Sequence, residues 1–406
     1  MSHEHFDELE TRDPQRRERE LFALLPRQIA HAKANAPWFA EALRNVDAAT
    51  VTSRAALAQL PVVRKHELIE LQKQHRPFGG LVAARWGQMG RVFSSPGPIY
   101  EPEGRDRDYW RTARALFAAG FRAGDLVHNS FSYHMTPGAW ILEGGALALG
   151  CTVFPGGVGQ TEQQVQAMAD LQPHGFVGTP SFLRILLDKA DELGLKIPSL
   201  TKALVSGEAF LPPVREAFAA RGITGYQAYA TADLGVIAYE TPAREGLVVD
   251  EDVILEIVRP GTGDPVPDGE VGEVVVTTFN QTYPLIRFGT GDLSAILPGV
   301  SSCGRTNLRI RGWLGRADQT TKVKGMFVHP EQVDAVRKRH PGIVRARLVV
   351  TNPDAVDTMT LLCEGSGEVS LIADSLRELT KLRGEVKFVD SLPNDGKVIS
   401  DERKYD

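Results

Sequence analysis

Four strand-like segments, each followed by a helix-like segment, constrain the fold of this chain more than any other feature. They are LVHNSF (126–131), TVFPG (152–156), GFVGT (175–179) and KALVSGE (202–208). Strands that alternate with helices predict a parallel sheet with helices on both faces. Ligands of such sheets bind beyond the carboxyl ends of the strands, so the residues that follow each strand are the first candidates for a site.

The segments on either side of this region predict other architectures. Residues 1–80 are expected to be mostly helical, because apolar residues in ELFALLPRQIAHAKANAPWFAEAL recur at three- and four-residue spacings. We assign these helices a covering role and no catalytic part. Residues 253–279 contain two β-rich runs around a turn of Gly, Pro and Asp, a pattern typical of antiparallel sheet.

The last part of the chain predicts a separate small domain. Its segments KVKGMFV, PEQVDAVRKR, ARLVV, MTLLCEG, SLIADSLRELTKL and EVKFVD alternate as β-α-β-β-α-β. The predicted fold class is α/β: a large N-terminal domain with parallel sheets flanked by helices plus an antiparallel β subdomain, and a small C-terminal α+β domain. We place the large domain at residues 1–316 and the small domain at residues 319–406.

The composition excludes several classes of protein. The formal charge is −5, from 46 Lys and Arg against 51 Asp and Glu, whereas a dedicated nucleic-acid binder usually carries a basic face. The three cysteines are scattered and odd in number, which fits neither a disulfide framework nor a zinc site. The N-terminus lacks a signal core and no apolar run approaches the roughly 18–20 residues of a membrane span. We therefore expect a cytoplasmic protein with no membrane and no nucleic-acid partner.

Three motifs follow one another in the second half of the chain. They are TYPLIRFGTGDL (282–293), GWLGRADQTTKVKGMFVHPEQVD (312–334) and LPNDGKV (392–398). In this order they resemble the closing half of phenylacetate–CoA ligase-type enzymes, which belong to the adenylate-forming superfamily; the resemblance runs from about Asn129 to the C-terminus. It implies that a carboxylic acid reacts with ATP to give an acyl-adenylate and pyrophosphate. Coenzyme A then displaces AMP to form the thioester.

The resemblance assigns the contacts with the nucleotide to Ser94, Ser95, Gly97, Gly207, Glu208, Tyr229, Ala230, Thr231, Asp292 and Arg316. Asp292 follows a Gly–Thr–Gly turn and can present two acceptor oxygens to a diol, so the resemblance makes it the ribose carboxylate. The alternative is a turn aspartate that stabilises its own backbone. Arg287, in the same motif, is either structural or faces phosphate.

The second and third motifs imply a moving small domain. By resemblance Asp318 is the hinge residue, within residues 317–319, about which the small domain rotates between an adenylation pose and a thioester-forming pose. Lys397 is then the catalytic lysine that stabilises the carboxylate–ATP transition state as a point cation. Lys404 is its alternative.

The segment GYQAYATAD (225–233) occupies the place of the family's motif Tyr-Gly-x-Ser/Thr-Glu. Asp233 stands where the family has glutamate, which makes it the candidate catalytic ligand of Mg²⁺. Because aspartate is one methylene shorter, a contact through water is the favoured geometry. SGEAF (206–210) resembles the adenine-side loop, where Gly207 allows close backbone approach.

The phosphate loop departs most from the family pattern. The family has a Ser/Thr/Gly-rich stretch that ends in Lys-Pro, whereas this chain has VFSSPGPIYEP (92–102). The threonines and the lysine are missing, and Glu101 would repel phosphate if it pointed inward. Arg91 or Arg105 could supply a substitute cation.

The acyl pocket is expected after the first strand of the parallel sheet. Tyr133 and His134 are its predicted lining, and Trp140 either joins them or belongs to the core. By family analogy the acid is an aryl or arylalkyl carboxylate.

The predicted cofactors and co-substrates are ATP, Mg²⁺ and coenzyme A, and the predicted partner is a small carboxylic acid. Two alternatives remain open. The acyl group could pass to the thiol of a carrier protein, or the altered phosphate loop could mark a degenerate nucleotide- or acyl-binding protein. The sequence also leaves open whether the chain is a monomer or a homodimer.

Overall fold

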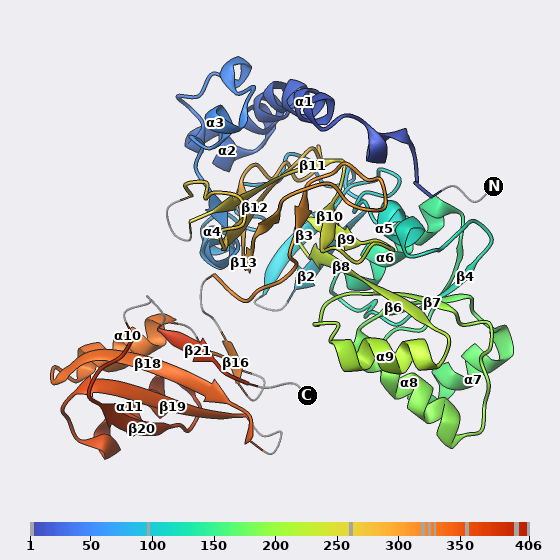
Figure 1. Ribbon diagram of the computed structural model, residues 1–406. Coiled ribbons are helices and arrows are strands. Elements are labelled where there is room, and N and C mark those ends of the chain that lie inside the picture. Colours follow the sequence, from blue (N-terminus) through green and yellow to red (C-terminus); the bar gives the residue numbers. More distant parts are fainter. Residues whose placement is uncertain are drawn as a thin grey trace. The chain divides into compact units, whose positions relative to one another are not determined.

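The computed structural model describes residues 4–95, 98–259, 263–317, 321–323, 326–328, 330–353, 357–393 and 398–403. It divides into two compact units, coloured along the chain in Figure 1. The large unit comprises Met1–Thr290 and Ser294–Leu314, and the small unit comprises Gly291–Leu293 and Gly315–Asp406. No helix in these residue ranges is both long and apolar enough to cross a membrane.

The large unit is organised around a nine-stranded sheet in the order β14-β15-β10-β9-β8-β7-β6-β4-β5. The pairs from β5 to β8 are parallel, whereas β8 and β9 form an antiparallel hairpin. The strands are β4 (Leu126–Asn129), β5 (Thr152–Pro155), β6 (Gly175–Gly178), β7 (Lys202–Val205), β8 (Thr224–Thr231), β9 (Gly235–Glu240), β10 (Leu247–Val249), β14 (Ile296–Leu297) and β15 (Arg309–Ile310).

Helices cover both faces of the parallel part of this sheet. On β7, Leu204 packs into the core with α5 (Ala113–Ala118) and α6 (Gly138–Leu149). Its neighbours Ala203 and Val205 point the other way, because side chains alternate along a strand. They pack against α7 (Thr161–Leu171), α8 (Pro180–Glu192) and α9 (Pro212–Ala220), which lie together in Figure 1. The predicted alternation of strands and helices is confirmed.

A second sheet of the large unit has the order β1-β13-β12-β11. Its strands are β1 (Val63–Arg64), β11 (Val253–Val258), β12 (Gly272–Thr278) and β13 (Phe288–Ser294). The predicted antiparallel pair at residues 253–279 is confirmed as β11 and β12, with Leu255 opposite Val276. Strand β1 pairs with β13 in parallel, with Val63 opposite Phe288.

The N-terminal segment is largely helical, as predicted, but in several pieces. It contains the 3-10 helices η1 (Glu8–Thr11), η2 (Ala48–Thr50) and η3 (Lys65–Glu67), and the α-helices α1 (Pro14–Asn35), α2 (Pro37–Ala42), α3 (Arg54–Leu57) and α4 (Leu68–Gln74). The break between α1 and α2 falls before a proline, which disfavours helical backbone in the residue that precedes it. A separate hairpin, β2 (Arg91–Ser95) with β3 (Ile99–Glu103), follows these helices.

The small unit is α+β. Its four-stranded sheet has the order β20-β19-β18-β21. The sheet packs with α10 (Pro330–Arg339) and α11 (Val369–Thr380) around one apolar core. The strands are β18 (Ile343–Thr351), β19 (Thr358–Gly365), β20 (Glu385–Val389) and β21 (Ile399–Asp401). The prediction of one strand in KVKGMFV is wrong, because β16 (Thr321–Val323) and β17 (Met326–Val328) pair as an antiparallel hairpin. Strand β21 was missed.

Candidate active site

Asp233 lies in the tight turn between β8 and β9, at the carboxyl end of β8. The turn is fixed by Thr231, whose Oγ1 accepts a hydrogen bond from the Leu234 amide at 3.2 Å. Gly235 follows with a φ of +73°, and a Cβ there would lie 2.7 Å from the Trp110 carbonyl oxygen. Only glycine meets both conditions. The turn therefore buries the Asp233 carboxylate, which is 1 % exposed.

Lys65 comes to Asp233 from a distant part of the sequence. It follows β1 directly, and its Nζ lies 2.6 Å from Asp233 Oδ2. The lysine side chain is 25 % exposed, whereas the aspartate side chain is fully buried. The other carboxylate oxygen, Asp233 Oδ1, has no hydrogen-bond partner within the described part of the chain. The pair thus combines an accessible cation with a carboxylate oxygen available for a ligand.

Glu101 points inward from the hairpin β2–β3. Residues 99, 101 and 103 of β3 all lie on its buried face, and Glu101 is completely buried. Its carboxylate accepts hydrogen bonds from the Ser95 hydroxyl and, at 3.3 Å, from the Ser95 amide. Both donors that Ser95 was predicted to offer a phosphate are therefore taken by a carboxylate in this structure.

The charges of Glu101 and Asp233 interact. Burial raises the pKa of Glu101 to about 8, and repulsion by Asp233 adds to the effect, while Lys65 opposes it. The phenol of Tyr283 responds to the same charges: burial, then Asp233 and Glu101, raise its pKa well above the ordinary value. The Tyr283 hydroxyl is also without a hydrogen-bond partner among the described residues.

The remaining predicted nucleotide residues of the large unit lie at strand ends. Tyr229 is half-buried on β8 and its hydroxyl donates to Thr290 Oγ1 at 3.2 Å. The register of β8 shifts between Tyr229 and Ala230. After β7, Gly207 has a φ of +80°, and Glu208 accepts from the Ser181 hydroxyl at 2.8 Å near the start of α8. In this structure Glu208 therefore contacts the first turn of that helix.

Two aromatic residues from the predicted acyl-pocket segment pack together. Tyr133 and Trp140 pack edge to face with centroids 5.1 Å apart. The Tyr133 hydroxyl donates to Glu143 Oε2 at 2.6 Å, which fixes the ring. A Cβ on Gly207 would lie 3.6 Å from the Phe131 ring, so this loop and the adenine-side loop are neighbours. His134 is exposed, and its role in the pocket stays a prediction.

The same loop is tied to the phosphate-loop hairpin. The Ser94 amide donates to the Met135 carbonyl oxygen at 2.8 Å. Met135 itself has a φ of +60°, which is uncommon for a residue with a side chain. The predicted acyl loop and the predicted phosphate loop are thus in direct contact.

In the small unit, two predicted nucleotide residues meet. Arg316 Nη1 lies 2.9 Å from Asp292 Oδ1, and the two residues also form an antiparallel bridge. Asp292 is 8 % exposed and Arg316 half-buried. The Asp292 carboxylate therefore binds a cation. Gly97, Asp318 and Lys397 lie outside the described residues.

Two arginines have clear structural roles. Arg287 is fully buried and binds Glu256 through Nε and Nη2 at 3.0 and 3.1 Å, so the structural alternative holds. Arg91 pairs with Glu103 at 2.7 Å and lies over the Trp140 ring at 3.9 Å. Neither guanidinium is directed at Asp233 by any of these contacts.

Lys65 was not identified as a candidate from the sequence, because residues 1–80 were assigned no catalytic part. The sequence signal for Lys65 was slight. A short β-type run, LPVV (60–63), ends at Arg64 and Lys65 inside a segment that otherwise reads as helix. Nothing in that pattern indicates which element β1 joins.

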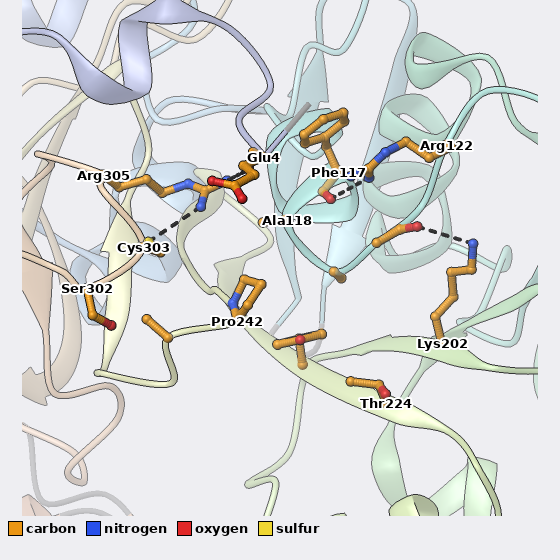
Figure 2. Close-up of a pocket in the computed structure, with 14 residues that line it drawn as sticks. Glu4, Phe117, Ala118, Arg122, Lys202, Thr224, Pro242, Ser302, Cys303 and Arg305 are labelled. Atoms are coloured by element: carbon orange, nitrogen blue, oxygen red, sulfur yellow. Dashed lines mark hydrogen bonds between the residues drawn. The ribbon is translucent and has the colours of Figure 1, made fainter. Parts of the chain in front are cut away.

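Two cavities lie away from all of these residues. One, of about 710 Å³, opens at the amino ends of β7 and β8, where Lys202 and Thr224 line it, opposite to the expected ligand edge. Figure 2 shows Arg305 there, between the Glu4 backbone and the Cys303 sulfur. The other, of about 1020 Å³, is lined by α2 and residues 74–89. No predicted site residue lines either cavity.

Comparisons with known proteins identify relatives of this chain. A family model described as AMP-binding enzyme matches residues 110–282. The chain is 32% identical over 361 residues to the phenylacetate–coenzyme A ligase of Aromatoleum evansii, covering 84% of this chain and 80% of the relative. It is 32% identical to the enzyme of the same name from Thermus thermophilus, with the same coverage.

Solved structures extend the similarity to almost the whole chain. A 2-hydroxyisobutyryl-CoA ligase, in complex with 2-HIB-AMP and CoA in the thioesterification state, matches with a TM-score of 0.75 and 26% identity. The match covers 98% of this chain and 92% of that one. The same ligase has also been solved in a postadenylation state with 2-HIB-AMP, at a TM-score of 0.74 and 25% identity. Motif order, fold and relatives coincide, and the chain belongs to the phenylacetate–coenzyme A ligase family of AMP-forming, adenylate-forming enzymes.

Proposed function

We propose that this chain activates a carboxylic acid with ATP and transfers the acyl group to coenzyme A. A carboxylate oxygen attacks the α-phosphorus and pyrophosphate leaves; the CoA sulfur then attacks the acyl carbon and AMP leaves. The observation that carries the proposal is the pair of Lys65 and Asp233, 2.6 Å apart at the carboxyl end of β8. It supplies a cation where negative charge develops and a buried carboxylate oxygen beside it.

Lys65 would replace the cation that the phosphate loop lacks. The loop has no lysine, and Arg91 is engaged by Glu103 and Trp140. A partly exposed ammonium on a flexible stem can interact with a phosphate oxygen as a point cation.

Mg²⁺ fits the residues present. Asp233 offers a buried oxygen without a hydrogen-bond partner in the described chain, and carboxylate oxygen is the donor that this ion prefers. Bound with the triphosphate, Mg²⁺ would supply Lewis-acid stabilisation of the leaving pyrophosphate.

The ribose and the adenine of the nucleotide would be bound by different residues. Asp292, which binds Arg316 through Oδ1, would accept the ribose hydroxyls. Tyr229 and the Gly207–Glu208 loop would border the adenine side. The acid would enter beside Phe131, Tyr133 and Trp140, whose rings favour an aryl or arylalkyl group.

The two half-reactions would require the small domain, residues 319–406, to rotate about Asp318. The postadenylation and thioesterification states of the related 2-hydroxyisobutyryl-CoA ligase support this proposal. Lys397→Ala should then slow adenylate formation and spare thioester formation from a supplied acyl-adenylate. Equal losses in both half-reactions would contradict the rotation. The cytoplasmic location and the homodimer stay predictions.

The experiment that tests the function is a screen of aromatic and aliphatic acids for pyrophosphate release, with and without CoA, followed by mass spectrometry of the products. Acid-dependent pyrophosphate and a CoA thioester are expected. Pyrophosphate release without any CoA thioester would favour a carrier-protein thiol. AMP binding without turnover of any acid would favour the degenerate binder.

A further inference from the structure

Gln164 and His128 form a buried polar pair near the carboxyl ends of the parallel strands. His128 lies on β4, and the strand register places it opposite Phe154 of β5 and Phe176 of β6. Its ring stacks with both, at centroid distances of 5.2 and 6.2 Å. On α7, Gln164 places its Oε1 2.7 Å from His128 Nε2. The histidine is 1 % exposed and the glutamine 4 % exposed, so the polar atoms of the pair depend on protein partners.

The same glutamine holds the loop that follows β5, residues 156–159, which we call the glycine loop. Gln164 Nε2 donates to the carbonyl oxygens of Gly157 and Gly159 at 3.0 and 2.6 Å. Its Oε1 is left as the acceptor, so His128 Nε2 is the donor. A Cβ on the first glycine of the loop would lie 2.7 Å from both of these atoms. The glycine loop therefore passes directly over the pair and is fixed by it.

The glycine loop in turn reaches the predicted acyl pocket through Asn129, the last residue of β4. The Gly157 amide donates to the Asn129 carbonyl oxygen at 3.0 Å, and the Asn129 side chain donates to the Tyr133 hydroxyl at 3.0 Å. A Cβ on Gly157 would lie 4.0 Å from Cδ2 of the Tyr133 ring. The glycine loop thus borders one edge of a ring that is predicted to line the acyl pocket.

The glycine loop has little rigidity of its own. Gly157 and Gly159 have φ values of +68° and +73°, which favour glycine, and glycine is the residue with the greatest conformational freedom. A firm position therefore requires contacts from outside the loop, and Gln164 supplies two. We propose that Gln164 is a positioning residue that limits the width of the acyl group, because it holds the glycine loop beside Tyr133. This inference rests on the proposed function.

The test measures by calorimetry how the full-length protein binds AMP and two analogues of the acyl-adenylate, the acylsulfamoyl adenosines of phenylacetate and 2-naphthylacetate. The analogues share the adenosine and differ in the width of the aryl group. The wild type should bind the phenylacetyl analogue more tightly. Gln164→Leu should reduce that preference by about tenfold, since a loose loop no longer excludes the wider ring, and should leave AMP affinity unchanged. A general loss of stability would instead weaken all three ligands alike.

Gln172→Leu is the matched control. Gln172 follows the other end of α7, where its Nε2 donates to the carbonyl oxygens of Ala169 and Lys196 at 2.8 and 3.0 Å. This variant should leave the preference between the analogues unchanged. Gln164→Glu keeps the size and the acceptor toward His128 but cannot donate to the loop, so it should lose the preference as Gln164→Leu does. It keeps the proposal testable if Gln164→Leu does not fold.

Three results would overturn the inference. They are a wild type without preference for the phenylacetyl analogue, an unchanged preference in Gln164→Leu and Gln164→Glu, and an equal loss of affinity for AMP and both analogues. An active ligase with an unchanged preference in both variants contradicts only this inference. A wild type that turns over no acid, but whose preference falls when Gln164 is substituted, contradicts only the proposed function.

Discussion

Arg287 and Lys65 each neutralise a buried carboxylate of the large unit. The two carboxylates differ in how completely their oxygens are hydrogen-bonded. Arg287 uses all five of its N–H groups, on both oxygens of Glu256 and on the carbonyl oxygens of Ala58, Leu60 and Gly263. Lys65 reaches one oxygen of Asp233 and leaves the other without a partner in the described chain. The arginine is 1 % exposed, whereas the lysine side chain is 25 % exposed.

The difference indicates what each region is for. A saturated pair has no capacity for a ligand and serves to join β11, β13 and the segment after α3. A pair that leaves one buried carboxylate oxygen without a partner in the described chain is costly for stability but can accept a ligand during a reaction. The following predictions test whether completeness of hydrogen bonding separates structural from functional charges in this chain.

Arg287→Met should give the largest loss of stability. It leaves Glu256 buried without its partner, which costs about 3–5 kcal/mol. Chemical denaturation followed by fluorescence would measure the shift. Arg44→Met, which removes an exposed pair with Glu41, is the control and should cost less than about 1 kcal/mol. AMP affinity should be unchanged in both variants. A specific loss of AMP binding in Arg287→Met would support the alternative in which this arginine faces phosphate.

Lys65→Met should reduce the rate of pyrophosphate release more than it reduces stability. We expect pyrophosphate release to slow by about 100-fold, because a preorganised charge at the transition state is lost. AMP affinity should change little. Lys73→Met, an exposed lysine on α4 paired with Glu70, is the matched control. Unchanged pyrophosphate release in Lys65→Met would show that the pair with Asp233 is structural and would break the comparison.

Asp250 also tests the comparison, because it is buried, its Oδ2 has no hydrogen-bond partner in the described chain, and it is not a predicted site residue. Burial, with repulsion from Asp252, raises its pKa to about 8. Its unfolded pKa is lower, so the folded state takes up a proton and wild-type stability falls as pH rises between the two values. Asp250→Asn should therefore gain relative stability with rising pH, by about 1.4 kcal/mol per unit between pH 5.5 and 7.

The measurement for Asp250 is the difference in thermal or chemical stability between variant and wild type at several pH values. Asp170→Asn, at an exposed position, should show no such trend. If the Asp250→Asn difference is also flat, this carboxylate is satisfied by a cation or solvent. Incomplete hydrogen bonding of a buried charge would then not distinguish functional from structural residues in this chain.

Tyr229→Phe should give the smallest effect. Its hydroxyl donates to Thr290 Oγ1, which in turn donates to the Val274 carbonyl oxygen at 3.1 Å. Removing one link of a neutral chain costs on the order of 1 kcal/mol, or about fivefold in AMP affinity. Calorimetry with AMP would measure it. A loss of AMP affinity of 100-fold or more would indicate that Tyr229 is a principal ligand of the nucleotide and does not merely border it.

The strand ends were predictable because they depend on local pattern. The alternation of strands and helices from Leu126 onward located the ligand edge, and Tyr229 and Asp233 lie at the end of β8 as that rule requires. The pairing of Asp292 with Arg316 connects two motifs 24 residues apart, and both were identified as nucleotide residues in advance. The role of Arg287 remained undecided, since a sequence motif does not reveal which carboxylate a guanidinium will meet.

By itself, the sequence determined the α/β class, the family and the order of the motifs, because periodicity and short motifs are encoded within a few turns of chain. Only the tertiary structure decided that Lys65 meets Asp233, 168 residues away, since this depends on the pairing of β1 with β13. It also decided that Glu101 faces inward. Alternation along β3 puts residues 99, 101 and 103 on one face, but apolar patterning would assign a glutamate to solvent. Packing of the hairpin overrides that preference, because the Ser95 amide and the Trp110 ring nitrogen donate hydrogen bonds to the buried carboxylates of Glu101 and Glu103.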